Sequence, residues 1–124
     1  MKELKIQAIG EVQSTREEKT GAGLLFIEVY PQFRKGLLGI EEGDELQILY
    51  WMHRLSEEKK NLLLVHPMGD RNRPRQGVFS LRSPVRPNPI GSSVIRVIKI
   101  RATGLLVQNL DALEGSPVID IKGI

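Results

Sequence analysis

The segment from Gly77 to Gly91, GVFSLRSPVRPNPIG, has the most unusual spacing of residue types in this chain. Pro84, Pro87 and Pro89 each fix one φ angle and lack a backbone donor, and each biases the preceding residue toward an extended conformation. We therefore expect a stiff, irregular connection that presents polar side chains in fixed directions. The side chains so presented are those of Arg82, Arg86 and Asn88.

Guanidinium groups on a rigid loop suit two kinds of ligand. They pair with carboxylates or phosphates, and they stack on nucleic-acid bases. A purely structural interpretation is equally open, in which the prolines shape a corner and the arginines donate hydrogen bonds to carbonyls of the loop itself. The residues alone do not decide between these two interpretations.

Metal and thiol chemistry are not expected. The chain has no cysteine, which excludes thiolate nucleophiles, iron–sulfur clusters and zinc sites that use sulfur. Its two histidines are His53 and His66. His66 precedes Pro67 and is interpreted as structural. His53 follows an apolar run, where a histidine bonded to backbone at a barrel rim is the simple alternative to a ligand-binding role.

Charge is distributed unevenly along the chain. From Asp70 to Arg101 there are eight Lys or Arg and one acidic residue, a net charge of +7, whereas the rest of the chain carries −4. This asymmetry favours a phosphate-bearing or polyanionic partner, and a solvated arginine-rich loop is the alternative. Three arginines alternate with other residues in one expected loop: Arg71, Arg73 and Arg75.

The elements that must hold these residues are short and of β type. With 124 residues and 27% charged residues, the chain has the size and balance of one globular domain. Runs rich in Val, Ile and Leu, separated by glycine-containing turns, predict antiparallel strands. The runs are Leu4–Ile9, Leu24–Tyr30, Glu45–Met52, Leu62–His66, Gly77–Leu81, Ser93–Arg101, Leu105–Gln108 and Pro117–Ile121. We expect an all-β fold, a small closed antiparallel β-barrel with irregular loops.

A few further features complete the expected fold. A short helix is predicted at Arg34–Leu38 or at Ser56–Lys60. Mobile loops are expected at Ser14–Gly23 and Gly69–Gln76, and a buried ion pair between Asp120 and Lys122.

The aromatic side chains of Phe33, Tyr50, Trp51 and Phe79 are expected to be core, with base stacking as the alternative. The N-terminal residues lack a long apolar run, so we expect a cytoplasmic protein without membrane association.

The run GVFSLRSPVRPNPIGSSVIRV, with NLDALEGSPVIDIK after it and the His53 segment before it, resembles the TsaA/TrmO-like family of S-adenosylmethionine-dependent tRNA methyltransferases. The resemblance covers about Ile6 to Lys122. It implies a barrel unlike the Rossmann-fold methyltransferases, with S-adenosylmethionine bound near the interface of a homodimer. It also implies N6-methylation of threonylcarbamoyladenosine next to a tRNA anticodon. The matched region predicts a single TsaA-like domain over residues 1–124, without the additional C-terminal domain of longer members.

Carried over position by position, the family's cofactor contacts fall on residues of four segments. They are His53, Arg54, Arg82, Ser92, Asp111, Ala112, Leu113 and Glu114. Arg82 suits the carboxylate of the cofactor, Asp111 or Glu114 suits the ammonium group or the ribose, and the backbone around Ala112 suits the adenine edge. Direct methyl transfer depends mainly on positioning, so no general base is required. Arg86 and Asn88 are therefore named only as candidates for orienting the acceptor.

One element of the family pattern is missing. Family members usually carry Pro-Arg-Gln in the first long loop, where this chain has Ser14-Thr15-Arg16-Glu17-Glu18-Lys19. Two alternatives to a tRNA methyltransferase stay open. The expected lack of the additional C-terminal domain favours a methyltransferase or binding protein for a small nucleotide-like acceptor. The missing Pro-Arg-Gln element allows a non-enzymatic barrel that binds RNA or a protein partner.

Overall fold

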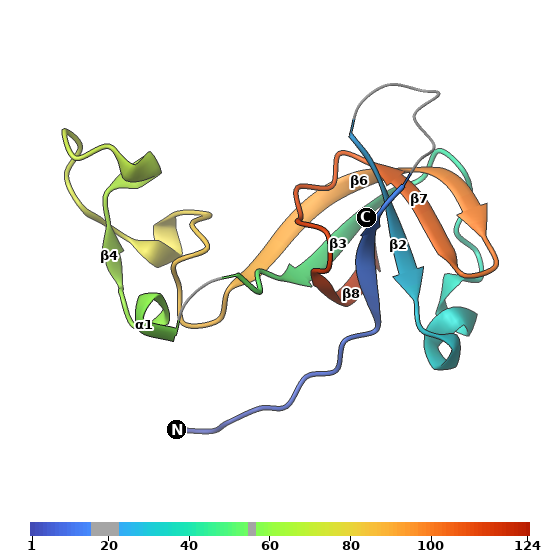
Figure 1. Ribbon diagram of the computed structural model, residues 1–124, viewed down its shortest axis with the longest axis horizontal. Helices are drawn as coiled ribbons and strands as arrows, with labels where there is room; N and C mark the ends of the chain where they lie inside the picture. The colour runs from blue at the N-terminus through green and yellow to red at the C-terminus, as the bar shows by residue number, and fades with distance from the viewer. Residues whose placement is uncertain (16–22, 55–56) are drawn as a thin grey trace.

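The computed structural model describes residues 1–15, 23–54 and 57–124, and within them six strands form a closed antiparallel barrel (Figure 1). In the order in which they pair around the barrel, the strands are β1 (Gly10–Ser14), β2 (Leu24–Val29), β7 (Gly104–Gln108), β6 (Ile90–Arg101), β3 (Glu45–Trp51) and β8 (Pro117–Gly123), and β8 pairs with β1. The expected all-β fold with a closed antiparallel barrel is confirmed.

The barrel strands alternate between an inward and an outward face, as the two-residue period of a strand requires. In β3, for example, Leu46, Ile48 and Tyr50 are buried and their neighbours are more exposed. The inward residues of all six strands build one core, in which Val12, Ile27, Ile48, Ile95, Val97, Leu105, Val107 and Val118 have at most 1% of their surface exposed. A barrel this small is filled by its own side chains, so a ligand of any size must bind at its rim or outside it.

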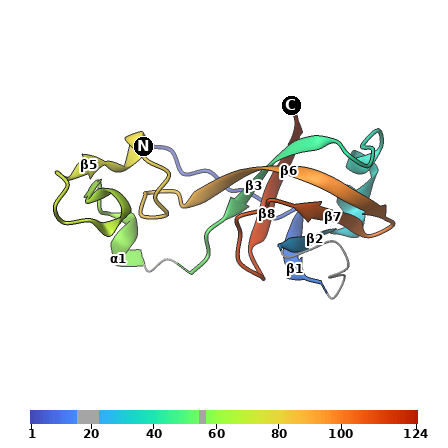
Figure 2. The same cartoon turned by 90° about the horizontal axis from the view of Figure 1, so that it is seen from above.

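A second part of the chain, which we call the arm (residues 57–81), projects from the barrel between β3 and β6 (Figures 1 and 2). It contains α1 (Glu57–Lys60), β4 (Leu64–Val65), the 3₁₀ turn η2 (Pro67–Gly69), β5 (Gln76–Gly77) and the 3₁₀ turn η3 (Val78–Ser80). β4 and β5 pair with each other only. The prediction that Leu62–His66 and Gly77–Leu81 are barrel strands was therefore wrong.

Local backbone geometry explains why the arm does not extend the barrel. Pro67 comes two residues after the end of β4 and cannot donate to a ladder. Met68 and Gly69 then adopt positive φ angles of 55° and 69°, which turn the chain sharply. The 3₁₀ turn η3 begins at the residue directly after β5 and so ends that strand.

The N-terminal prediction was also wrong: residues 1–9 lie outside the strands, and β1 begins at Gly10. Gly10 is the first residue that pairs with both neighbours, with Val29 of β2 and Val118 of β8. Leu4 and Ile6 point into solvent, with 84% and 55% of their surface exposed. The alternating pattern of this segment suits a strand, but the closed barrel offers it no edge with which to pair.

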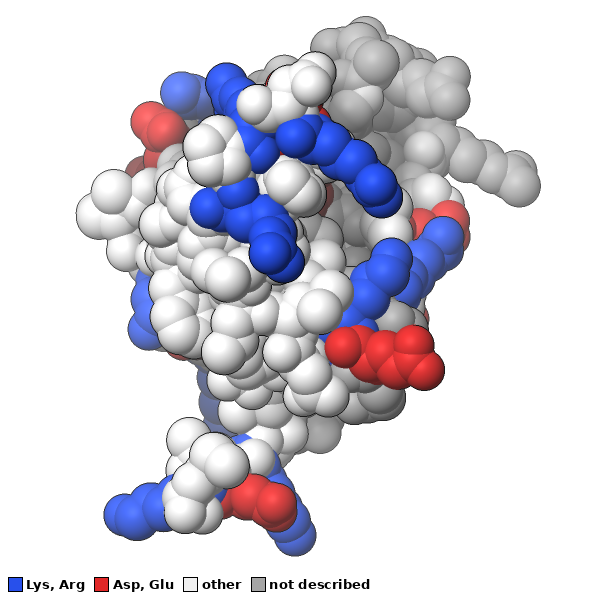
Figure 3. Space-filling model, turned by 90° about the vertical axis from the view of Figure 1, so that its left-hand side faces the viewer, with Lys and Arg blue, Asp and Glu red and all other residues white. Residues whose placement is uncertain are grey.

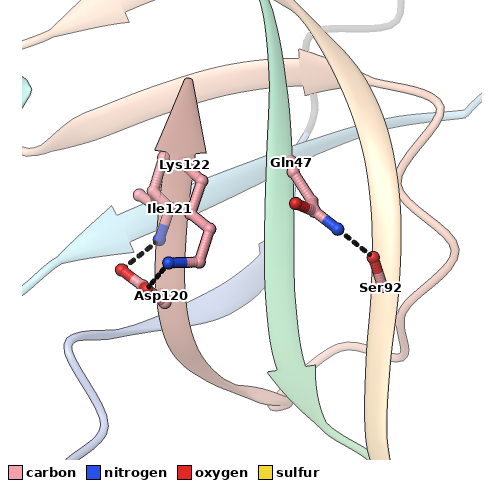
Figure 4. A network of polar contacts seen from close by, with 5 residues as sticks. All are labelled: Gln47, Ser92, Asp120, Ile121 and Lys122. Carbon is pink, nitrogen blue, oxygen red and sulfur yellow. Dashed lines mark hydrogen bonds and ion pairs between the residues drawn. The ribbon is translucent and has the colours of Figure 1, made fainter. Parts of the chain in front are cut away.

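The remaining predictions, of short helices, a loop and a buried ion pair, have different outcomes. Residues Pro31–Leu37 form a 3₁₀ helix, η1, at one of the two expected helix positions, and α1 lies at the other, with Ser56 outside the described residues. Most of the predicted loop Ser14–Gly23, including the Arg16–Lys19 stretch, also lies outside them. Asp120 and Lys122 do form an ion pair, at 3.1 Å, but their side chains are 45% and 55% exposed, so the prediction of burial was wrong (Figure 4).

Candidate functional site

A hollow of about 850 Å³ lies where one rim of the barrel meets the segment that leads back from the arm. Three stretches of chain surround it: the end of β3 and the residues after it, residues 81–92, and the loop between β7 and β8, residues 109–116. The middle stretch contains the segment of residues 82–89 that we call the proline loop, and the first residues of β6. Its lining consists of Tyr50, Met52, His53, Arg54, Leu81, Arg82, Pro84, Arg86, Asn88, Ile90, Gly91, Ser92, Asp111, Ala112, Leu113 and Ser116. Its volume lies within the range of ligand sites in proteins.

The proline loop is braced from inside by Arg86. The Arg86 guanidinium donates from Nη1 to the carbonyls of Leu81 at 3.1 Å and Ser83 at 2.9 Å. At its far end the buried Pro89 accepts a backbone hydrogen bond from Met52 at 2.7 Å. The loop is therefore fixed to the end of β3. Arg86 Nη1 donates to backbone carbonyls, as the structural interpretation of the arginines expects.

Arg82 ties the proline loop to β6. Its Nη2 donates to the Ser92 carbonyl at 2.7 Å, and the side chain is otherwise exposed. A guanidinium has five N–H donors, so this one bond among the described contacts leaves donors for an anionic ligand. The Ser92 hydroxyl accepts from Gln47 Nε2 of β3 at 2.9 Å, and it keeps its own O–H to donate (Figure 4).

A buried pair of hydroxyls holds the β7–β8 loop against the barrel. Tyr50 donates from its phenol to the Asp111 carbonyl, and the Asp111 N–H donates to Ser93 Oγ at 3.1 Å. Ser93 in turn donates to the Tyr50 oxygen at 3.4 Å. Tyr50 and Ser93 are only 5% and 8% exposed, so water competes little for these bonds.

Gly91 makes this arrangement possible. It faces Tyr50 across the β3–β6 ladder, and a Cβ atom at this position would lie 2.4 Å from two carbons of the Tyr50 ring. Any larger residue would push the ring away from the Asp111 loop. The glycine after Pro-Ile in the proline-rich run therefore serves the packing of the site.

The far end of the β7–β8 loop is held by backbone and serine contacts. Gly115, with φ of +86°, donates from its N–H to the Val12 carbonyl at 2.7 Å, and Ser116 Oγ donates to the Leu113 carbonyl at 2.6 Å. A Cβ atom on Gly115 would lie 3.8 Å from His53 Nε2, so the imidazole lies close to this turn. Residues after β3 and residues before β8 thus meet across the hollow.

The structure brings together nine of the ten residues that the sequence singled out. The residues that line the hollow are His53, Arg54, Arg82, Arg86, Asn88, Ser92, Asp111, Ala112 and Leu113. Glu114 is not part of the lining, and its carboxylate accepts a hydrogen bond from the Ser14 hydroxyl at 3.1 Å. The individual roles of these residues stay predictions.

Other lining residues escaped the sequence analysis. Tyr50 was expected to be core, which its burial supports, but its phenol also bonds the loop that lines the hollow. Ser116 had no distinguishing signal in the sequence. For Tyr50 and Met52, the one usable sign was their position shortly before His53, at the end of the predicted strand Glu45–Met52.

His66 lies away from the hollow, in the arm. Its Nδ1 lies 2.8 Å from the Arg73 carbonyl, which agrees with the structural role expected for it. Within the described ranges, the structure groups no three or more His, Asp or Glu side chains in a way that could hold a metal ion. No helix in the described parts of the chain is long and apolar enough to cross a membrane.

The face of the molecule at which the arm projects is rich in basic side chains. Figure 3 views this face, and Lys and Arg side chains cover much more of it than Asp and Glu side chains do. In the arm, Arg71, Arg73 and Arg75 are all exposed. Asp70 shapes their loop, because its Oδ1 accepts from the Asn72 N–H at 2.9 Å and its carbonyl accepts from the Arg73 N–H at 3.1 Å.

Residues 12–124 match the family described as the tRNA-methyltransferase O N-terminal domain. The chain belongs to this family. The match includes the barrel except for the first two residues of β1, the whole arm and every residue that lines the hollow. The family resemblance predicted from the proline-rich run is confirmed.

Two curated relatives are similar to most of this chain. A probable S-adenosyl-L-methionine-binding protein of Methanocaldococcus jannaschii is 44% identical over 97 residues, which cover 77% of this chain and 77% of that protein. Another, from Pyrococcus horikoshii, is 40% identical over 119 residues, which cover 95% of this chain and 80% of the relative. The ligand in both names is the cofactor that the sequence predicted.

A solved structure shows the same fold. The crystal structure of TrmO from Pseudomonas aeruginosa superimposes with a TM-score of 0.73 at 28% identity, over 99% of this chain. The match covers 56% of that solved chain, so this chain spans just over half of its length. The non-Rossmann barrel expected for the family is therefore the architecture of this protein as well.

Proposed function

We propose that this protein is an S-adenosylmethionine-dependent methyltransferase whose cofactor binds in the hollow between the proline loop and the β7–β8 loop. The observation that carries the proposal is the composition of that hollow, because residues from three distant parts of the sequence meet there with complementary chemistry. Membership of the family and the names of its relatives support the same cofactor.

The residues present fit the cofactor group by group. S-adenosylmethionine has a carboxylate, an ammonium group, a sulfonium, a ribose and an adenine. Arg54 and Arg82 offer guanidinium donors for the carboxylate, and Asp111 offers a carboxylate for the ammonium group or the ribose hydroxyls. The apolar side chains of Met52, Leu81, Pro84, Ile90 and Leu113 provide the largely apolar wall that ligand sites of this size have.

When bound, S-adenosylmethionine supplies an electrophilic methyl group that leaves a neutral thioether behind. The chain itself needs to bind the cofactor, orient the acceptor toward it and exclude water. Positioning alone contributes a large part of the rate of such a transfer. The proline loop is built for this task, because Arg86 braces it from within and Pro89 fixes it to the end of β3. Tyr50 and Ser93 do the same for the backbone around Asp111.

The acceptor that we propose is tRNA, with N6 of threonylcarbamoyladenosine next to the anticodon as the target implied by the family resemblance. The basic face around the arm supports a nucleic-acid acceptor, because exposed arginines attract the phosphate backbone whatever its sequence (Figure 3). A cytoplasmic location, where tRNA is found, remains a prediction.

We also propose a homodimer. Large apolar side chains are exposed on the arm, namely Leu62, Leu63, Leu64, Met68 and Phe79, each with about half or more of its surface in solvent. Two residues of the hollow, Ile90 and Leu113, are likewise 39% and 53% exposed. Apolar surface of this kind marks an interaction site, and a second copy that covers it would also close the hollow.

Two measurements on one preparation test the proposal. Calorimetric titration with S-adenosylmethionine should show saturable binding, and mass analysis of tRNA after incubation with enzyme and cofactor should show one added methyl group. Binding without tRNA methylation would leave the cofactor site in place and favour a small nucleotide-like acceptor or a binding module. The absence of binding would remove the proposal as a whole.

A further inference from the structure

A second hollow, of about 500 Å³, lies on another side of the proline loop. It is lined by Trp51, Lys60, Asn61, Leu63, Pro87 and Asn88. These residues come from the end of β3, from α1 and the residues after it, and from the proline loop. None of the residues named for the cofactor belongs to this lining, and Asn88 was named only as a candidate for orienting the acceptor.

Asn88 lines both hollows and so forms part of the wall that they share. Its backbone position is fixed, because Pro87 and Pro89 flank it and its carbonyl accepts the Ile90 N–H at 2.7 Å. A direct methyl transfer needs the donor and the acceptor in adjacent sites that hold their relative positions. Two hollows that share the lining residue Asn88, held in a fixed position, are adjacent sites of this kind.

The second hollow has the chemistry of a site for a nucleobase. Trp51 is half-buried and supplies an aromatic ring on which a base can stack. Asn61 and Asn88 each carry an amide that donates and accepts, which suits the edge of a base. Lys60 places its ammonium over the Trp51 ring, 5.5 Å from the ring centre, so the hollow also carries a cation that suits the phosphate of the same nucleotide.

We propose that the second hollow receives the acceptor base of a single-stranded RNA, stacked on Trp51 and bounded by Asn88. This inference rests on the proposed function and names the part of the site that the acceptor would use. In the transfer, a nitrogen of the base forms the new N–C bond as the C–S bond of the cofactor breaks. The sulfur keeps the electron pair of that bond, and the nitrogen releases its proton to solvent. Asn88 is then a positioning residue for the acceptor.

Trp51 is the only tryptophan of the chain, so its fluorescence reports directly on this hollow. The experiment titrates a short synthetic single-stranded RNA, one adenosine flanked by uridines, into the full chain in the presence of S-adenosylhomocysteine to prevent turnover. The base should quench the Trp51 fluorescence on binding. In parallel, the anisotropy of a labelled copy of the same RNA reports binding anywhere on the protein.

Variants separate this hollow from the rest of the surface. Trp51→Leu should weaken RNA binding about 5- to 150-fold by anisotropy, the range expected for the loss of one stacked base. Lys60→Gln should weaken it more than Lys59→Gln does, since Lys59 is an exposed neighbour in α1 that does not line the hollow. Calorimetry with S-adenosylmethionine should give wild-type affinity for all three variants.

The opposite results overturn the inference without touching the cofactor site. They are RNA binding that leaves Trp51 fluorescence unchanged, equal effects of Lys60→Gln and Lys59→Gln, or no RNA binding by the wild type. Loss of S-adenosylmethionine binding in the wild type would instead overturn the proposed function itself.

Discussion

Arg82 occupies the position at which the proline loop meets β6, with one N–H group committed to the Ser92 carbonyl. If its remaining donors bind the cofactor carboxylate, Arg82→Ala should weaken S-adenosylmethionine binding by about 1.5–3 kcal/mol, the value of a hydrogen bond to a charged group. Calorimetry measures the difference. Arg75→Ala, the removal of an arginine in the arm outside the hollow, is the matched control and should leave the affinity unchanged. Equal affinities for wild type and Arg82→Ala would remove this residue from the site.

The residues of the cofactor site differ in how clearly the sequence identifies them. Arg82, Asn88 and Asp111 were identified because they stand in a specific run of residue types. Tyr50 was not identified as part of the site, because an inward-facing tyrosine on a strand has the sequence pattern of core. Only the folded register places its phenol beside the Asp111 carbonyl and shows why residue 91 must be glycine.

The β7–β8 loop is the element whose position depends on that phenol. Tyr50→Phe removes the donor to the Asp111 carbonyl and the acceptor for Ser93. We expect the free energy of unfolding to fall by about 0.5–1.5 kcal/mol, the net value of a hydrogen bond, and S-adenosylmethionine binding to weaken as the loop loosens. Urea denaturation and calorimetry measure the two effects. Unchanged cofactor affinity in a destabilised Tyr50→Phe protein would show that the hydrogen bonds among Tyr50, Ser93 and Asp111 stabilise the barrel only.

The arm is the second element whose role is open to measurement. If its arginines contact the tRNA backbone, the logarithm of the binding constant should fall with the logarithm of salt concentration by about 0.7–0.9 per phosphate neutralised. A triple variant with Arg71, Arg73 and Arg75 changed to Ala should show a smaller slope. Filter binding across a salt series provides both slopes. Equal slopes, or no tRNA binding by the wild type, would argue against the arm as a phosphate contact.

Element prediction succeeded where a run of residues forms its own signal. The alternation in Glu45–Met52 and Ser93–Arg101 predicted β3 and most of β6, because each buries one face in the barrel. It failed for Leu4–Ile9 and for the arm, since pairing depends on which edge the rest of the fold leaves open. The predicted burial of the ion pair between Asp120 and Lys122 was wrong for a related reason. The sequence predicted the pair but not that both side chains lie on the outward face of β8.

At the scale of the whole molecule, the exposed apolar residues of the arm predict self-association. Light scattering at micromolar concentration with cofactor present should give twice the chain mass of 14.0 kDa. Phe79→Asp should shift the protein toward the monomer, since a charge in an apolar interface is costly. Leu38→Asp is the control, because Leu38 is 94% exposed but follows η1, outside the arm. A wild-type mass of one chain would contradict the dimer.

The central claim is that the hollow between the proline loop and the β7–β8 loop is a cofactor site. Calorimetric titration of the wild-type protein with S-adenosylmethionine tests it most directly. We predict saturable binding of one cofactor per chain, which the related compound S-adenosylhomocysteine displaces. Heats that do not exceed those of dilution, at cofactor concentrations well above the protein concentration, would contradict the claim.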